Sequence, residues 1–242
     1  MAGTKTKAAK KRKSQKDDAE AKAAKDDTFE ENAAKVEQVV IPAPNLKGFS
    51  WMIEGDAPYV QNKFSEKARG EMIATQKAGT QTAKGKKKDP KDFKQCYLGA
   101  LHVDKSGHYG IPANAFRQAL ISACRLVNFK MTIGKLALFI HADGFDKDDG
   151  TPLVRITKGK PRQVEHAVRL PNGSADIRVR PMWDEGWQAK VRIRYDADIF
   201  SATDVGNLLM RVGLQVGVGE GRPDSKKSAG MGWGTFQLQL AS

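Results

Sequence analysis

The chain has 242 residues, of which 41 are lysine or arginine and 28 are aspartate or glutamate, so its formal net charge is +13 at pH 7. Its apolar content of 40% lies in the globular range, and no apolar run reaches the roughly 18–20 residues of a membrane span. Two cysteines cannot form a disulfide framework or a cysteine-rich zinc domain. Composition therefore excludes a membrane protein and a disulfide-stapled secreted domain, and the charge indicates a polyanionic partner.

Charge is concentrated near the N-terminus, which also lacks the apolar core of a secretory signal. Residues 1–16 carry seven basic side chains and no acid, and residues 17–35 carry seven acids against three lysines. This composition predicts a disordered arm over residues 1–35, which either binds phosphates or only keeps the chain in solution. The folded domain is expected over residues 36–242.

The segment after the arm changes character. Lys47–Ile53 predicts a strand, and residues 59–76 carry apolar side chains at helical spacing. Residues 77–95 hold seven lysines against two aspartates and no aliphatic anchor, which predicts a mobile basic loop inserted in the domain. The apolar run Cys96–Val103 predicts a further strand. The loop supplies four candidate phosphate contacts: Lys84, Lys86, Lys87 and Lys88.

Two amphipathic helices are predicted, over Ala113–Val127 and Ala202–Val212. Pro112 suits the start of the first helix, while Ser201 is a good N-cap for the second and Asp204 complements its dipole. The second helix is expected to end at the following glycine. The buried stripes are expected to be Phe116, Leu120, Ala123, Cys124 and Val127 in the first helix, and Val205, Leu208, Leu209 and Val212 in the second.

Strand candidates, separated by Gly, Pro and Asp clusters, fill most of the space between the helices: 136–142, 153–157, 164–170, 175–183 and 187–195. In the last two, basic and apolar residues alternate, and a period of two places the basic side chains of a strand on one face. We expect one strongly positive sheet face formed by Arg178, Arg180, Lys190, Arg192 and Arg194. The alternative is an ordinary solvent face of an antiparallel sheet.

The sharpest motif is a pair of glycine clusters before a closing strand at Phe236–Leu240. Gly217, Gly219 and Gly221 alternate with other residues, and Gly230, Gly232 and Gly234 repeat the pattern after a basic segment. The spacing matches neither the dinucleotide fingerprint nor a P-loop. Glycine permits positive φ, and exposed amides in such a loop can bind an anion. We expect phosphate binding here, or else a glycine-rich hairpin without a ligand; the candidate residues are Gly219, Gly221, Arg222, Lys226, Lys227, Gly230 and Gly232.

The rest of the sequence gives only weak indications of a catalytic or metal site. The acidic stretch Asp143–Gly150 has Phe145 and Lys147 where a calcium loop needs acids, so it predicts a hairpin turn. The four histidines lack the spacing of a metal site. No nucleophile or general base is specified, and we expect no cofactor, no catalytic residue and no resident metal. A metal-dependent nuclease that uses Asp143 or Asp146 stays as an alternative.

The helix start Tyr109–Leu120, taken with the late glycine loop, resembles the RAMP superfamily, the repeat-associated RNA-binding proteins that form the backbone of CRISPR effector complexes. Ile111, Pro112, Ala119 and Leu120 match that family's helix-start motif, whereas Ala113-Asn114 and Gln118 depart from it. The resemblance spans residues 45–240 in order, and these two stretches carry it. The chain is also similar to uncharacterised tailed-phage proteins around Phe64–Arg69 and Met231–Phe236.

The resemblance implies an α+β, ferredoxin-like (RRM-like) antiparallel sheet with two helices, here with extra β-strands and the basic insertion. It implies that Arg117 and the Arg222–Lys227 loop contact a nucleic-acid backbone and that copies stack head to tail. The expected function is to coat single-stranded RNA or DNA through phosphates, in the bacterial cytoplasm or in a host cell during phage infection. The alternative is a phage structural or assembly protein. The candidates for base stacking are Trp51, Trp183, Trp187 and Trp233.

Overall fold

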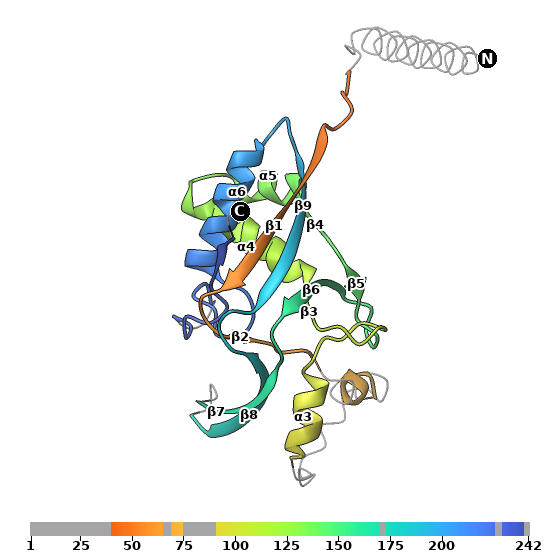
Figure 1. Cartoon of the computed structure of the whole chain (residues 1–242), viewed down its shortest axis with the longest axis vertical. Coiled ribbons are helices and arrows are strands. Elements are labelled where there is room, and N and C mark those ends of the chain that lie inside the picture. The colour runs from red at the N-terminus through yellow and green to blue at the C-terminus, as the bar shows by residue number, and fades with distance from the viewer. Residues whose placement is uncertain (1–39, 65–68, 75–90, 170–172, 226–228, 240–242) are drawn as a thin grey trace, which may run out of the picture. The chain divides into compact units, whose positions relative to one another are not determined.

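The computed structural model describes residues 40–64, 69–74, 91–169, 173–225 and 229–239 (Figure 1). The chain divides into two units, Met1–Ala43 and Pro44–Ser242, and the strands and helices that follow belong to the second. The predicted arm over residues 1–35 lies outside the described residues. So do most of the basic insertion, with Lys84 and Lys86 to Lys88, and the pair Lys226 and Lys227.

The first third of the domain differs from the sequence prediction. After β1 (Leu46–Gly55), the predicted helix over 59–76 begins instead with a short strand, β2 (Tyr59–Val60), and only residues 69–74 are helical among those described. The predicted strand Cys96–Val103 is wrong, because α3 (Phe93–Gly99) occupies its first half and the second half keeps only an isolated bridge at Val103. The Asp92 side chain accepts the Gln95 amide at 3.0 Å and caps this helix, which overrides the apolar run.

The middle of the chain follows the predicted order more closely. A helix, α4 (Ala113–Leu126), starts directly after β3 (Gly110–Pro112), and its predicted stripe is buried except for Val127, which is 43% exposed. A short helix that was not predicted, α5 (Met131–Ala137), precedes the next strand. The strands that follow are β4 (Leu138–His141), β5 (Gly144–Phe145), β6 (Pro152–Lys158), β7 (Arg162–Arg169), β8 (Ala175–Trp183) and β9 (Gln188–Asp196).

The last helix, α6 (Ala202–Arg211), has the predicted capping. Ser201 accepts the Asp204 amide at 3.1 Å, and the Asp204 carboxylate accepts the Ser201 amide in return. The predicted end at Gly213 is wrong, because a π-helical turn, η1 (Val212–Val216), continues the helix to Gly217. The chain then forms the glycine loop and β10 (Phe236–Leu238).

The strands form two antiparallel sheets. In the seven-stranded sheet the order is β10-β1-β9-β6-β3, with β4 also paired to β9 and β5 to β6; the smaller sheet has the order β2-β8-β7. Both helices α4 and α6 pack on one face of β1 and β9 and share one core with them (Figure 1). The other face of β9 is not covered by these helices. The protein is therefore α+β with antiparallel sheets, as predicted, although it has more than the two expected helices.

Candidate nucleic-acid interface

The glycine loop between η1 and β10 brings both glycine clusters together. All six of its glycines have φ between 71° and 87°, the left-handed region. A Cβ at Gly234 would lie 1.8 Å from the Val218 carbonyl oxygen, and a Cβ at Gly230 would lie 2.1 Å from that of Arg222. Two loop segments of the backbone therefore cross here, at a distance that only glycine permits.

Most backbone amides of this loop are engaged within the protein. The Met231 amide donates to the Gly221 carbonyl at 2.7 Å, the Glu220 amide to the Val60 carbonyl at 2.9 Å, and the Gly234 amide to the Pro58 carbonyl at 2.7 Å. These bonds join the loop to itself and to the β1–β2 connection. The amides of Glu220, Met231 and Gly234 were not among the candidate phosphate contacts, so the expected role of Gly219, Gly221, Gly230 and Gly232 stays a prediction.

A carboxylate from the glycine loop joins it to β8. Arg180 Nε donates to Glu220 Oε2 at 2.6 Å, and Arg178 Nη1 donates to Oε1 at 3.2 Å. Arg222 Nη1 donates to the Gly219 carbonyl at 3.0 Å, so its charge is not neutralised by that contact. Two guanidinium groups thus share one carboxylate, and Arg222 adds a third positive charge to the same loop. Arg180 and Glu220 are 40 positions apart in the sequence, and no pattern in it predicted that they meet.

A pair of half-buried rings lies beside these arginines. The His166 and Trp233 ring centroids are 4.9 Å apart with an interplanar angle of 42°. His166 is paired with Arg178 across β7 and β8, so the two side chains share a sheet face. Its Nε2 is buried and has no hydrogen-bond partner in the described part of the chain. We name this set the hairpin–loop surface: His166, Arg178, Arg180, Glu220, Arg222 and Trp233.

The predicted single basic face across β8 and β9 is wrong. β8 belongs to the three-stranded sheet, whereas β9 lies in the larger sheet between β1 and the pair β4 and β6. The alternation within each strand is real, but alternation says which residues share a face and not which strand lies next to them. The result is two separate groups, the hairpin–loop surface and the open sheet face of β9, which carries Lys190, Arg192 and Arg194.

The open sheet face is partly neutralised. Arg192 donates to the Ala142 carbonyl at 3.2 Å and to the Asp143 carboxylate. The Arg194 guanidinium lies 5.5 Å from the centre of the Phe139 ring, a cation–π contact. Lys190 is exposed. This face is a second group of basic side chains, with one aromatic ring among them.

Arg117 lies with the open sheet face and not with the glycine loop. Its Nε donates to the Leu138 carbonyl at 3.0 Å and its Nη2 to the Lys135 carbonyl at 2.5 Å, so it caps the end of α5. Its guanidinium also lies 5.3 Å from the centre of the Phe139 ring. The resemblance implied that Arg117 and the late loop act together on one backbone, but the contacts of Arg117 among the described residues are with α5 and Phe139 and not with that loop.

The four tryptophans have different environments. Trp183 and Trp187 are fully buried in the core, and the Trp187 indole donates to the Ala57 carbonyl at 2.9 Å. The Trp51 ring packs against Phe49, with their centroids 4.6 Å apart. Trp233 is half-buried on the hairpin–loop surface. Its ring contacts His166, which is paired with Arg178 on the neighbouring strand.

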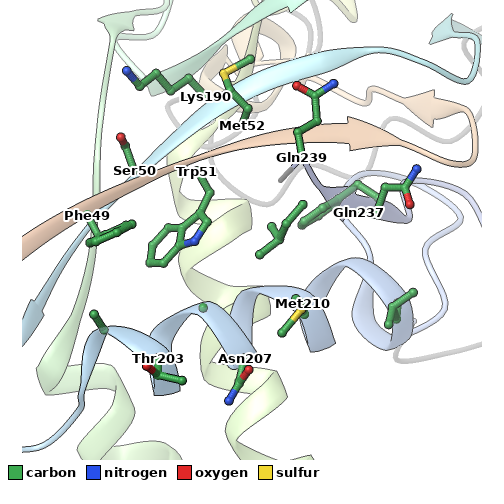
Figure 2. Close-up of a pocket in the computed structure, with 15 residues that line it drawn as sticks. Phe49, Ser50, Trp51, Met52, Lys190, Thr203, Asn207, Met210, Gln237 and Gln239 are labelled. Carbon is green, nitrogen blue, oxygen red and sulfur yellow. The ribbon is translucent and has the colours of Figure 1, made fainter. Parts of the chain in front are cut away.

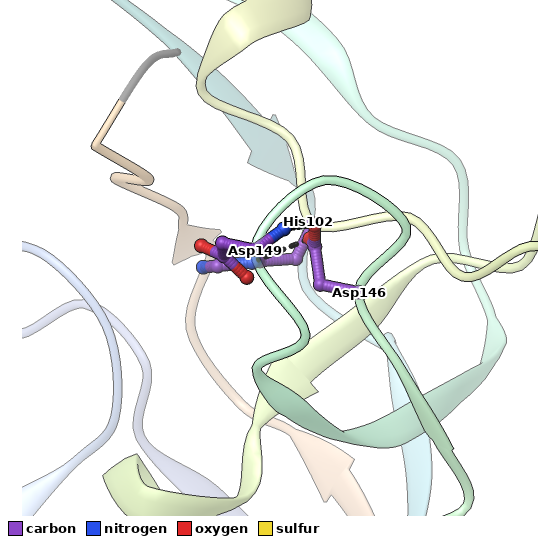
Figure 3. A group of neighbouring side chains, drawn as sticks. All are labelled: His102, Asp146 and Asp149. Atoms are coloured by element: carbon purple, nitrogen blue, oxygen red, sulfur yellow. Dashed lines mark hydrogen bonds and ion pairs between the residues drawn. The ribbon is translucent and has the colours of Figure 1, made fainter. Parts of the chain in front are cut away.

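The acidic stretch forms the predicted hairpin turn, and a buried charge cluster anchors it. Asp146 accepts from Lys63 Nζ at 2.7 Å. Its other carboxylate oxygen lies 2.8 Å from His102 Nδ1, and Figure 3 shows this pair together with Asp149. Burial raises the pKa of Asp146, but hydrogen bonds from Lys63, the Asp148 amide and His102 outweigh it and lower the pKa to about 2. Lys63 also donates to Asp148 at 2.6 Å. No sequence pattern indicated Lys63 as the partner of this turn.

His102, Asp146 and Asp149 offer ligand atoms within 4.8 Å of one another, a donor set that suits a divalent cation. The Lys63 ammonium already supplies the positive charge beside Asp146, so the geometry fits an internal ion pair better than a metal centre. Asp143 accepts the Arg155 amide at 2.8 Å and pairs with Arg192. Both carboxylates of the nuclease alternative are thus engaged in holding the fold.

No family model matches this chain, and no curated protein matches it. The RAMP resemblance is therefore a matter of the two sequence stretches alone. Within the described part of the chain, every helix is too short or too polar to cross a bilayer.

Proposed function

We propose that this protein binds single-stranded nucleic acid through the hairpin–loop surface. The observation that carries the proposal is the pairing of Arg178 and Arg180 with the single carboxylate of Glu220, on a loop that also carries Arg222, beside the half-buried Trp233–His166 ring pair. Guanidinium groups bind phosphates, and aromatic rings stack on unpaired bases without sequence preference. The same loop carries Lys226 and Lys227 in the sequence, which adds to its positive charge.

We further propose that the domain is ferredoxin-like, as the RAMP resemblance implies. In support, the strand order β10-β1-β9, with β4 on the far side of β9, places α4 in the connection from β1 to β4 and α6 in that from β9 to β10. Head-to-tail stacking of copies along one strand remains a prediction of the resemblance. The choice between RNA and DNA is open to the experiment below.

The test is fluorescence anisotropy with labelled single-stranded RNA, single-stranded DNA and duplex DNA, titrated with the full chain at several salt concentrations. The pair of substitutions Arg178→Ala and Arg222→Ala should weaken single-strand binding about tenfold or more. The slope of log K against log salt should flatten by about 0.7 for each phosphate that the variant no longer neutralises. Arg211→Ala is the matched control, because Arg211 lies on α6 beside a different groove, with Phe129 and Phe200.

Two further variants separate the rival surfaces. Arg194→Ala removes a cation from the open sheet face, and a loss of binding confined to this variant would move the site there. Replacement of Lys10, Lys11 and Lys13 by alanine tests the arm, and a loss confined to it would mean that the folded domain does not bind. A protein that binds none of the three probes at physiological salt would fit the structural or assembly alternative.

A further inference from the structure

The outer edge of β1 is open at its N-terminal half. Odd-numbered residues of β1 hold the ladder to β9, as the bonds from the Gly55 amide to Trp187 at 2.8 Å and from the Ala197 amide to Asn45 at 2.7 Å show. Even-numbered residues therefore direct their amides and carbonyls outward. β10 pairs with β1 at Ile53–Gly55, and the Gln239 amide reaches the Met52 carbonyl at 2.9 Å. Beyond this point, Leu46, Gly48 and Ser50 have no strand partner on the outer side within the described part of the chain.

This edge lacks most of the features that usually prevent pairing. The register between β1 and β9 is regular from Leu46 to Glu54, so no bulge twists the edge away. No proline interrupts it, and Leu46, Gly48 and Ser50, whose backbone groups point outward, are uncharged, although the exposed Lys47 lies between them. Leu46 and Phe49 are 44% and 50% exposed. A regular, partly apolar open edge is a template for another strand.

An apolar groove runs along the same edge. It encloses about 1010 Å³ between β1 and α6 and is lined by Phe49, Trp51, Met210 and Leu214, among others. Figure 2 shows Phe49 and Trp51 pointing toward α6, whereas Ser50, Met52 and Lys190 point to the opposite side of the sheet. A strand added here would extend the layer over α6, as β10 does with the buried Phe236.

The edge is self-complementary about Gly48. In an antiparallel pair of two β1 strands with Gly48 on the two-fold axis, Leu46 of one copy faces Ser50 of the other, and the outward amides and carbonyls match. Because residue 48 is glycine, no two side chains collide where the strands cross the two-fold axis. Both open sheet faces then lie on the same side, and their basic strands are three strand spacings apart, roughly 14 Å. That separation exceeds the Debye length of about 8 Å at physiological salt, so repulsion between Arg194 residues is largely screened.

We propose that the open edge of β1 is an interface for a second copy of this chain, which closes a two-fold dimer by pairing the two β1 strands about Gly48. The dimer doubles the width of the sheet and makes its basic open face continuous across both copies. The proposal does not depend on the hairpin–loop surface, because the two use different residues.

The test is register-specific cross-linking of the full chain, in a Cys96→Ser background. Hydrogen-bonded antiparallel partners have Cα atoms about 5.5 Å apart, within disulfide range, so Gly48→Cys should give a covalent dimer under mild oxidation. Ser50→Cys is the matched control, since its symmetry mate lies about four residues away along the strand and should not link. Light scattering on the unmodified chain should give twice the monomer mass.

Several outcomes would overturn the proposal. One is a chain that is monomeric in solution. Another is a dimer in which Gly48→Cys and Ser50→Cys both form the disulfide, or in which neither of them does. Species that keep growing beyond a dimer would indicate head-to-tail assembly instead. A second test uses charge: Gly48→Lys and Gly48→Glu should each be monomeric alone and should form a dimer when they are mixed. Because a misfolded variant would not dimerise on mixing, this result separates a lost interface from a lost fold. Gly70→Lys, in a helical segment where a side chain meets no neighbouring atom, should leave the mass unchanged.

Discussion

Arg180 Nε donates to the Glu220 carboxylate at 2.6 Å, and this contact joins β8 to the glycine loop. If the surface binds phosphates, Glu220 repels them while it holds the arginines. We expect Glu220→Gln to keep a hydrogen-bond partner for Arg180, to remove one negative charge and to tighten single-strand binding about threefold to tenfold at low salt. Anisotropy titrations of this variant beside Asp184→Asn, which removes an exposed charge paired with Arg162, check it. Unchanged or weaker binding would contradict the phosphate assignment.

Backbone crossing in the glycine loop predicts a sharp difference between two similar substitutions. Gly234 and Gly232 have nearly equal φ values of 71° and 74°, but a Cβ would meet the Val218 carbonyl at Gly234 and no atom within 4 Å at Gly232. Gly232→Ala should cost about 1–2 kcal/mol from its left-handed backbone alone. Gly234→Ala should cost clearly more, about 3 kcal/mol or above, because backbone must move. Urea unfolding of both variants measures the difference, and equal losses of stability would show that the loop relaxes freely.

The Asp146 cluster makes stability depend on pH in the acid range. The pKa of Asp146 is lowered from 3.8 to about 2 in the folded chain. Because the folded pKa lies below the unfolded one, the stabilisation is complete above about pH 4 to 5 and disappears as the pH falls toward 2. At neutral pH it amounts to about 2–3 kcal/mol.

The corresponding variant is Asp146→Asn, which leaves Lys63 buried beside a neutral amide and should cost about 3–5 kcal/mol at pH 7. The gap between variant and parent should narrow at pH 3, as followed by urea unfolding at both values. Asp184→Asn serves as the surface control, since its exposed pair with Arg162 should contribute under about 1 kcal/mol. A pH-independent gap would show that packing, and not charge, holds this turn.

The two cysteines should differ in reactivity. Cys124 is fully buried on α4, and burial raises the pKa of its thiol. Cys96 is half-exposed. A thiol reagent should therefore modify Cys96 in the folded chain and reach Cys124 only after unfolding, because the thiolate is the reactive form. Mass spectrometry of peptides after timed labelling measures how much of each cysteine has been modified. Rapid labelling of Cys124 without denaturant would mean that α4 opens readily.

Periodicity predicted much of the fold, because both helices and most strands bury one regular face. The stripe Val205, Leu208, Leu209 and Val212 and the Ser201 cap are found as expected. The strand prediction for Cys96–Val103 was wrong because a short apolar run is compatible with either a strand or a helix. The Asp92 cap favours the helix. The helix end at Gly213 failed because this glycine serves packing: a Cβ there would lie 1.9 Å from the Phe236 carbonyl oxygen.

Less of the candidate site could be predicted. Arg178, Arg180 and the glycine loop were candidates from the sequence, but the contact that unites them depends on Glu220, which carries no local pattern. His166 reaches the β8 arginines and Trp233 through the pairing of β7 with β8, a long-range relationship that strand alternation does not contain. The RAMP resemblance also implied Arg117 as a nucleic-acid contact, but its hydrogen bonds go to carbonyls at the end of α5.

The neighbours of β1 have a consequence for how the chain folds. β1 pairs with β9 and β10, which are made from residues 188–196 and 236–238, so its partners leave the ribosome long after β1 itself. The central sheet therefore cannot close during most of synthesis, and such non-local pairing is slow to form. Until then β1 has both edges unpaired, and Phe49 and Trp51 remain without their neighbours on α6. A nascent chain stalled before β9 should bind a general chaperone, and one released after β10 should not.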